Sequence, residues 1–221
     1  MAAEQENSAE TKELSQGEQQ HAQEAGSSRR QTRIAVFVSG GGTNLQALLD
    51  VERRGELPHG HICLVVSNRA DAYALTRARK AGVETAVVSK DEARLLTLLA
   101  EAQIDLIVLA GYLAILSEDF TKRYANRILN IHPSLIPSFC GKGFYGLKVH
   151  EAALAYGVKV TGATVHYVNE VPDGGKIILQ KAVAVEEGDT PEVLQQRVMR
   201  EAEWILLPQA AELVSRKLLG L

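Results

Sequence analysis

The feature that most constrains the fold is a regular alternation of short apolar runs with longer amphipathic stretches. The apolar runs are bounded by Gly, Asn, Ser or Asp and lie at residues 34–38, 62–67, 85–88, 104–110 and 128–131. Runs that are apolar at nearly every position are typical of strands covered on both faces. The stretches between them have the periodicity of amphipathic helices and cover residues 43–54, 70–81 and 91–103. This alternation predicts an α/β fold, with a doubly wound and mostly parallel sheet.

The alternation of predicted strands and helices changes after the fifth apolar run. A Gly/Pro-rich loop at residues 133–146 leads into a helical stretch at 147–156. Two further extended runs, 161–168 and 177–185, flank a turn and predict antiparallel strands added at the C-terminal side of the sheet. Residues 191–219 predict one long helix or two, with a kink or a break at Pro208.

The first 32 residues differ from the rest of the chain. They are rich in Glu, Gln, Ala and Ser and contain no aromatic residue. Such a segment cannot bury enough apolar surface to offset the entropy lost on ordering. We therefore expect a disordered or weakly helical tail at 1–32 and a single domain at 33–221.

Composition argues against several classes of function. The net charge is -3 with no basic run, which gives no support to nucleic-acid or membrane-surface binding. No apolar stretch approaches the roughly 20 residues of a spanning helix. The N-terminus lacks a signal peptide's apolar stretch, so we expect a cytoplasmic protein. Cys63 and Cys140 are far apart and form no metal-ligand or redox spacing, and we expect no metal site.

A glycine run follows the first predicted strand, in the segment Ser39 to Asn44. Glycines let the backbone approach a ligand closely, and the free N–H groups at a helix start attract anions. The run is neither a Walker A loop nor a dinucleotide fingerprint. It predicts a phosphate site, unless Thr43 or Asn44 simply caps the helix.

The fifth apolar run ends in Asn130 and His132. Alternate residues of a strand share one face, so both polar side chains point the same way near the strand's carboxyl end. Ligands of parallel sheets bind at that edge. A histidine there is often only a hydrogen-bonded packing residue, but the neighbouring amide favours a functional interpretation.

The polar turn Asn169 to Gly175 separates the last two extended runs. Asp173-Gly174 is a common turn dipeptide, and that is its simplest explanation. If Asp173 met His132, its charge would favour the imidazolium and raise the pKa of His132.

A turn of small and apolar residues follows the fourth run, in Ala110 to Leu116. It is either core and the start of a helix, or an apolar wall with exposed backbone groups suited to a flat heteroaromatic ligand.

Four motifs together resemble those of the phosphoribosylglycinamide formyltransferase family. They are SGGGTNLQAL from Ser39, LAGYLAILS from Leu109, LNIHPSLIP from Leu129 and TVHYVNEVPDGG from Thr164. The resemblance covers nearly all of the chain after Arg33 and implies a Rossmann-like formyltransferase fold. It implies transfer of a formyl group from 10-formyltetrahydrofolate to the amine of glycinamide ribonucleotide, without a metal.

The resemblance also implies roles for individual residues. Asn130, His132 and Asp173 would form the catalytic set. The ribonucleotide would be held by Gly42, Thr43 and Asn44 at its phosphate and by Glu203 at its other polar groups. The folate would contact Leu113, Ala114, Ile115, Leu116, Asn130, Val168, Asn169, Glu170 and Asp173.

Some positions depart from the family's pattern. Ala114 stands where many members have arginine, and Lys176 where proline is frequent. The helix from Leu194 to Glu203 is one residue longer than usual when it is counted back from Pro208. Arg94 is the only candidate we find for a contact to the folate's glutamate tail.

These residues suit formyl transfer. The tetrahedral species carries an oxyanion, to which Asn130 and protonated His132 could both donate hydrogen bonds. Asp173 would keep His132 charged and relay the amine's proton through water. We expect a monomer or homodimer acting on small molecules.

Three other functions need to be considered. A formyltetrahydrofolate hydrolase would share the Asn/His/Asp set but is expected to carry a further N-terminal domain. A methionyl-tRNA formyltransferase is expected to carry a further C-terminal one. A non-catalytic module that binds phosphate or nucleotide would use the glycine loop alone, leaving Asn130 and His132 unexplained.

Overall fold

The computed structural model describes residues 30–221. The predicted tail therefore lies outside the described residues, apart from its last three positions. Of these, Thr32 is already the first residue of strand β1, one residue before the expected start of the domain. The division of the chain at residue 32 otherwise stays a prediction.

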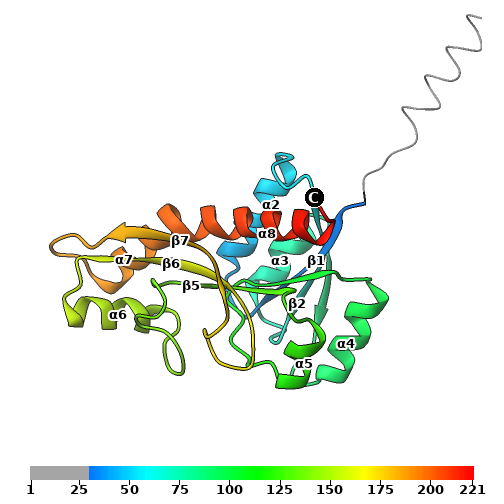
Figure 1. Cartoon of the computed structure of the whole chain (residues 1–221), viewed down its shortest axis with the longest axis horizontal. Helices are drawn as coiled ribbons and strands as arrows, with labels where there is room; N and C mark the ends of the chain where they lie inside the picture. Colours follow the sequence, from blue (N-terminus) through cyan, green and yellow to red (C-terminus); the bar gives the residue numbers. More distant parts are fainter. Residues whose placement is uncertain (1–29) are drawn as a thin grey trace, which may run out of the picture. The chain divides into compact units, whose positions relative to one another are not determined.

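A seven-stranded mixed sheet forms the centre of the domain (Figure 1). Its strand order is β3-β2-β1-β4-β5-β6-β7, in which the first five strands are parallel and β6 and β7 are antiparallel additions. The bounds are β1 Thr32–Val38, β2 Gly60–Ser67, β3 Glu84–Val87, β4 Leu106–Leu109, β5 Ile128–His132, β6 Val160–Tyr167 and β7 Ile177–Ala184. The predicted fold class is confirmed, including the antiparallel strands on the C-terminal side.

Helices cover both faces of the sheet. Alternate residues of β1 point to opposite faces, so Ile34 and Val36 join the core under α2, α3 and α8, while Ala35 and Phe37 join the core under α4 and α5. The bounds of these helices and of α6 are α2 Thr43–Arg53, α3 Tyr73–Lys80, α4 Glu92–Glu101, α5 Glu118–Arg123, α6 Leu147–Tyr156 and α8 Trp204–Leu218. Among the described residues, no helix is both long and apolar enough to cross a membrane.

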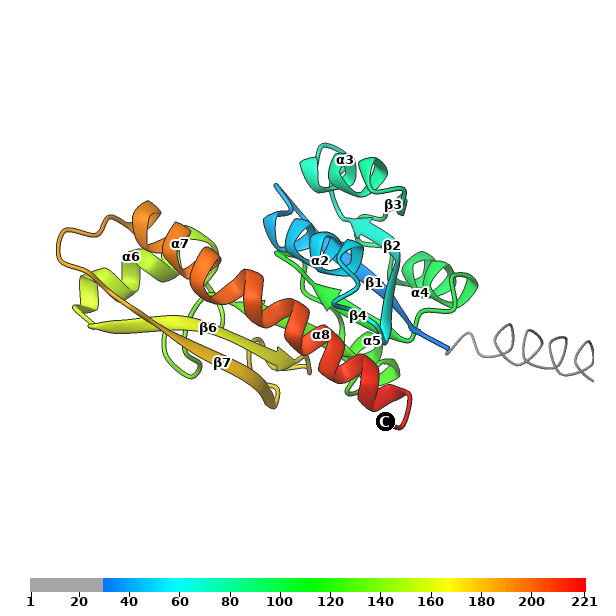
Figure 2. The same cartoon turned by 90° about the horizontal axis from the view of Figure 1, so that it is seen from above.

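The C-terminal helical region is interrupted, but not at Pro208. Helix α7, Pro191–Val198, runs into a π-helical segment η1, Met199–Glu203, and then into α8. Pro208 lies inside α8, so a break at this proline is wrong, while a kink there stays a prediction. A π-helical turn holds more residues than an α-helical turn, which accommodates the extra residue seen on counting back from Pro208. Figure 2 shows α8 running along the sheet.

The chain reverses direction across the sheet between β1 and β4. From β1 it moves outward to β2 and β3, and it then returns to β4 on the other side of β1. Open α/β sheets bind ligands outside the carboxyl ends of strands at such a point. Ser39 links the two strand ends, because its N–H donates to the Gly111 carbonyl and its hydroxyl accepts from the Leu113 N–H.

Candidate active site

The glycine loop after β1 leaves the start of α2 uncapped by any side chain. Gly42 is the N-cap residue in the left-handed conformation, with φ 73°, and no side chain accepts from the first turn. Thr43 and Asn44 are the first two residues of the helix, so the alternative in which one of them caps it is wrong. The first N–H groups of a helix have no partner within it, which makes this end suited to an anion.

Asn44, at the start of α2, contacts Glu203 of the π-helical segment. The Asn44 Nδ2 donates to the Glu203 Oε2 at 2.6 Å, and both side chains are buried. Burial raises the pKa of Glu203 to about 6, although the hydrogen bond from Asn44 acts in the opposite direction. Asn44 Oδ1 is also buried and has no hydrogen-bond partner among the described residues. Asn44 Oδ1 is therefore free to accept a hydrogen bond from a ligand.

The three predicted catalytic residues are close together. Asn130 and His132 both come from β5, and the turn between β6 and β7 brings Asp173 to them. The Asp173 Oδ1 lies 3.4 Å from Asn130 Nδ2, and its Oδ2 lies 3.6 Å from His132 Nδ1. The turn is held tightly to β6, because a Cβ on Gly175 would lie only 1.7 Å from the Tyr167 carbonyl oxygen.

The electrostatics of His132 differ from the expectation. Burial lowers the pKa of His132 below its usual value and outweighs the charge of Asp173 and the Phe139 carbonyl, which both act to raise it. The predicted rise of this pKa is therefore wrong, and the neutral imidazole is the favoured form at neutral pH. Burial also acts to raise the pKa of Asp173, but the neighbouring His166 and His132 and the hydrogen bond from the Gly141 N–H outweigh it, and the pKa is lowered.

A second histidine, which the sequence analysis did not single out, completes the cluster. His166 on β6 pairs directly opposite Asn130 across the antiparallel ladder. Its Nδ1 lies 2.8 Å from the Tyr167 carbonyl oxygen, and its Nε2 lies 3.2 Å from Asn130 Nδ2 and 3.5 Å from Asp173 Oδ1. Since the carbonyl can only accept, Nδ1 carries the proton of a neutral ring, and Nε2 accepts from the Asn130 amide. His166 thus orients the amide.

Two contacts from the backbone of the loop after β5 were also not predicted. The Gly141 N–H donates to Asp173 Oδ2 at 2.8 Å, and the Phe139 carbonyl lies 2.9 Å from His132 Nε2. His132 therefore donates from Nε2 when it is neutral. The loop contributes only backbone groups to these contacts, so the side chains of its sequence could not reveal them.

The predicted folate residues lie on a surface segment and on the β6–β7 turn. The side chains of Leu113 and Ile115 are 60% and 83% exposed, whereas Leu116 is buried in the core. The backbone groups of residues 114–116 make no hydrogen bond within the described part of the chain. Exposed apolar side chains beside unpaired backbone groups are the features that a flat heteroaromatic ring needs. Val168 and Asn169 are half-buried and Glu170 is exposed.

The strand register relates the glycine loop to the cluster of Asn130, His132 and Asp173. Phe37 of β1 pairs with Leu109 of β4, which pairs with Asn130 of β5. The two groups of residues are therefore separated by two strand spacings, roughly 10 Å. Within residues 30–221, no group of three or more His, Cys, Asp or Glu side chains is arranged to hold a metal ion.

Comparison with known proteins gives a consistent picture. The chain matches the formyl transferase family over residues 32–211. It is 42% identical over 184 residues to phosphoribosylglycinamide formyltransferase of Haemophilus influenzae, covering 80% of this chain and 84% of that protein. It is 44% identical over 194 residues to the bovine trifunctional purine biosynthetic protein adenosine-3, covering 84% of this chain. The chain spans 18% of the bovine protein and 61% of the chloroplastic phosphoribosylglycinamide formyltransferase of Vigna unguiculata.

Solved structures show the same relationship. Glycinamide ribonucleotide transformylase 1 from Symbiobacterium toebii superposes with a TM-score of 0.78 at 44% identity, covering 85% of this chain and 89% of that one. A formyltetrahydrofolate deformylase from Pseudomonas syringae gives a TM-score of 0.75 at 30% identity, covering 85% and 62%. The fold and the family resemblance are confirmed, and the deformylase shows that one fold serves two reactions.

Proposed function

Because the chain belongs to the formyl transferase family, we propose that it transfers the formyl group of 10-formyltetrahydrofolate to the amine of glycinamide ribonucleotide. The observation that carries this proposal is the convergence of Asn130, His132 and Asp173, two strands away from an uncapped helix start. This arrangement offers an anchor for a phosphate and, beside it, polar groups for chemistry on a carbonyl carbon.

The glycine loop and the buried Asn44–Glu203 pair suit the ribonucleotide. The N–H groups at the start of α2 would bind its phosphate. Glu203 and the unpaired Asn44 Oδ1 would accept hydrogen bonds from its hydroxyl or amide groups. A ligand that lacked these donors would leave the buried oxygens unsatisfied, which supports selectivity for a polar phosphorylated acceptor.

Asn130 and His132 would stabilise the oxyanion that develops when the amine attacks the formyl carbon. One N–H of the Asn130 amide is held by His166. The other points to Asp173 Oδ1 at 3.4 Å and would turn to the substrate oxygen, while neutral His132 carries its proton on Nε2. Each donor of this kind typically contributes about 10² to 10³ in rate. Donation by His132 requires Nε2 to exchange the Phe139 carbonyl for the substrate oxygen. Gly141, Gly143 and Gly146 lie in the loop that carries this carbonyl and give it conformational freedom.

Asp173 would act on the proton of the attacking amine. Its lowered pKa keeps it ionised at neutral pH, so the carboxylate can accept this proton and pass it through water to the departing folate nitrogen. It would also stabilise His132 whenever that ring becomes charged, because its Oδ2 faces His132 Nδ1. The exposed segment around Leu113 and Ile115 would bind the folate ring.

A spectrophotometric assay with 10-formyltetrahydrofolate, with and without glycinamide ribonucleotide, tests the proposal. We expect loss of the formyl donor only when the ribonucleotide is present, together with formation of the formylated ribonucleotide. Loss without the ribonucleotide would identify a deformylase. Binding of the ribonucleotide without any loss would identify a non-catalytic module. The cytoplasmic location and the monomeric or homodimeric state stay predictions.

A further inference from the structure

Helix α3 holds two consecutive carbonyl groups of the glycine loop. The Ala74 N–H donates to the Gly40 carbonyl at 3.0 Å, and the Arg77 Nε donates to the Gly41 carbonyl at 2.8 Å. In a planar trans peptide unit the C=O and the following N–H point in opposite directions. These contacts therefore direct the N–H groups of Gly41 and Gly42 away from α3, which exposes them to an anion at the start of α2.

Arg77 also contacts the first turn of the helix that would receive the anion. Its Nη1 donates to the Gln46 Oε1 at 3.0 Å, and the backbone N–H of Gln46 donates to the Gly42 carbonyl at 2.9 Å. The guanidinium thus links Gly41, which precedes Gly42, to Gln46 in the first turn of α2. The planar guanidinium can donate in two directions at once, which suits such a link, whereas a lysine ammonium is a compact point charge.

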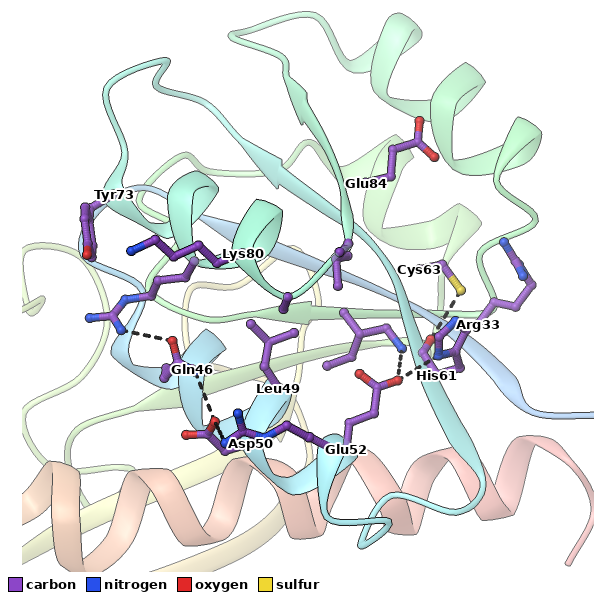
Figure 3. Close-up of a pocket in the computed structure, with 16 residues that line it drawn as sticks. Arg33, Gln46, Leu49, Asp50, Glu52, His61, Cys63, Tyr73, Lys80 and Glu84 are labelled. Atoms are coloured by element: carbon purple, nitrogen blue, oxygen red, sulfur yellow. Dashed lines mark hydrogen bonds and ion pairs between the residues drawn. The ribbon is translucent and has the colours of Figure 1, made fainter.

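The remaining contacts of Arg77 fix the guanidinium in place. It lies over the Tyr73 ring, 5.1 Å from the ring centroid, and its acceptor Gln46 in turn donates to Asp50 at 3.1 Å. These residues line one end of a groove of about 970 Å³ between α2, α3 and β2, where Figure 3 shows Tyr73, Gln46 and Asp50. Because the groove is open, a changed side chain at position 77 has room without disturbing the core.

We propose that Arg77 is a positioning residue for the ribonucleotide phosphate. It sets the direction of the loop's N–H groups without itself taking part in formyl transfer. The inference rests on the proposed function, because it assumes that the glycine loop binds this phosphate.

The test compares Arg77→Gln and Arg77→Lys with the wild-type chain in steady-state kinetics and in calorimetric titration with glycinamide ribonucleotide. We expect both variants to raise the KM and Kd for the ribonucleotide by about tenfold, the usual effect of losing a charged hydrogen bond. The kcat and the KM for 10-formyltetrahydrofolate should change less than twofold. Arg79→Gln on the same helix is the control, since this side chain is exposed, and it should change none of these values.

The outcomes separate the inference from the proposed function. If the wild-type chain transfers the formyl group and Arg77→Gln binds the ribonucleotide normally, the inference is wrong. Full recovery of affinity by Arg77→Lys would also overturn it, because charge alone would then explain the effect. A fall in kcat with unchanged KM would show an effect on chemistry instead. If the wild-type chain does not transfer formyl, the proposed function fails, while the titration still tests Arg77.

Discussion

At the scale of single residues, Glu203 is held in a state that disfavours its ionisation. Its carboxyl is buried and its pKa is raised to about 6 from 4.5. Folding is therefore favoured when the carboxyl is protonated. The loss of stability caused by ionising this buried carboxyl is absent below about pH 4.5. It develops as the pH rises through about 6. At neutral pH it amounts to about 2 kcal/mol of lost stability.

We predict that Glu203→Gln stabilises the protein by about 2 kcal/mol at pH 7.5 and has little effect near pH 4.5. Glutamine can keep the contact with Asn44 without a buried charge. The same variant should raise the KM for the ribonucleotide. Urea unfolding at both pH values is the measurement, and Glu201→Gln, at an exposed position, is the control. A gain in stability that does not vary with pH would contradict this interpretation of Glu203.

His150 on α6 is also disfavoured when it is charged, but because a histidine is charged at low pH, the pH dependence of stability is opposite to that of Glu203. Its ring is fully buried, and neither nitrogen has a hydrogen-bond partner among the described residues. Burial, together with His132, lowers its pKa to about 4 from 6.5. The folded state thus favours the neutral ring, and stability that is present above pH 6.5 is lost as the pH falls toward 4, by roughly 3 kcal/mol.

We predict that His150→Leu removes most of this acid sensitivity. The change keeps a similar volume and buries no unpaired nitrogen, so stability at pH 7 should change by less than about 1.5 kcal/mol. Thermal unfolding followed from pH 7 to pH 4.5 measures the effect, with His61→Gln as a control at an exposed histidine. An unchanged acid transition would show that other groups cause it.

At the scale of elements, the glycine loop and α3 fit together at one close contact. Gly42 has φ 73°, and a Cβ there would lie 2.6 Å from the Ala74 Cβ. Both the conformation and the space therefore require glycine. Gly40 differs, because it has no positive φ and an added Cβ would meet nothing within 4 Å.

We predict that Gly42→Ala destabilises the protein by about 1 to 3 kcal/mol, the usual range for a non-glycine residue in this conformation. Gly40→Ala should stay within about 0.5 kcal/mol of the wild type, since it only reduces the freedom of the unfolded chain. Denaturant unfolding of both variants is the measurement. Equal stabilities would mean that α3 yields easily to the added methyl group.

At the scale of the whole molecule, binding and chemistry use different parts of the chain. The proposed phosphate anchor comes from the β1–α2 loop, with Glu203 from the π-helical segment. The proposed catalytic cluster comes from β5 and the β6–β7 turn. Only the order of the strands in the sheet brings these parts together.

We predict that His132→Ala and Asp173→Ala retain affinity for glycinamide ribonucleotide within about threefold but lose at least about 10² in kcat. The reason is that neither side chain belongs to the phosphate anchor. Calorimetric titration and single-turnover assays separate the two effects. Near-normal turnover in both variants would remove these residues from the mechanism.

Much of this arrangement could be predicted because it depends on local pattern. Period-two alternation placed Asn130 and His132 on one face, and the glycine run marked the start of α2. His166 was missed because its position opposite Asn130 depends on the register of an antiparallel pair. The pKa of His132 was predicted with the wrong sign, because the pattern suggested its charged neighbour but could not show how deeply the ring is buried.

The sequence by itself determined most of the elements, their order and the family, since hydrophobic periodicity and short motifs are properties of neighbouring residues. The short helix α5 and the π-helical segment η1 were not predicted. The tertiary structure decided which distant groups meet. It brought Asp173 to His132 and Glu203 to Asn44, moved the helix irregularity from Pro208 to η1, and placed Arg77 on the glycine loop. The physical reason is that hydrogen bonds and desolvation act across space, between residues whose separation along the chain leaves no periodic trace.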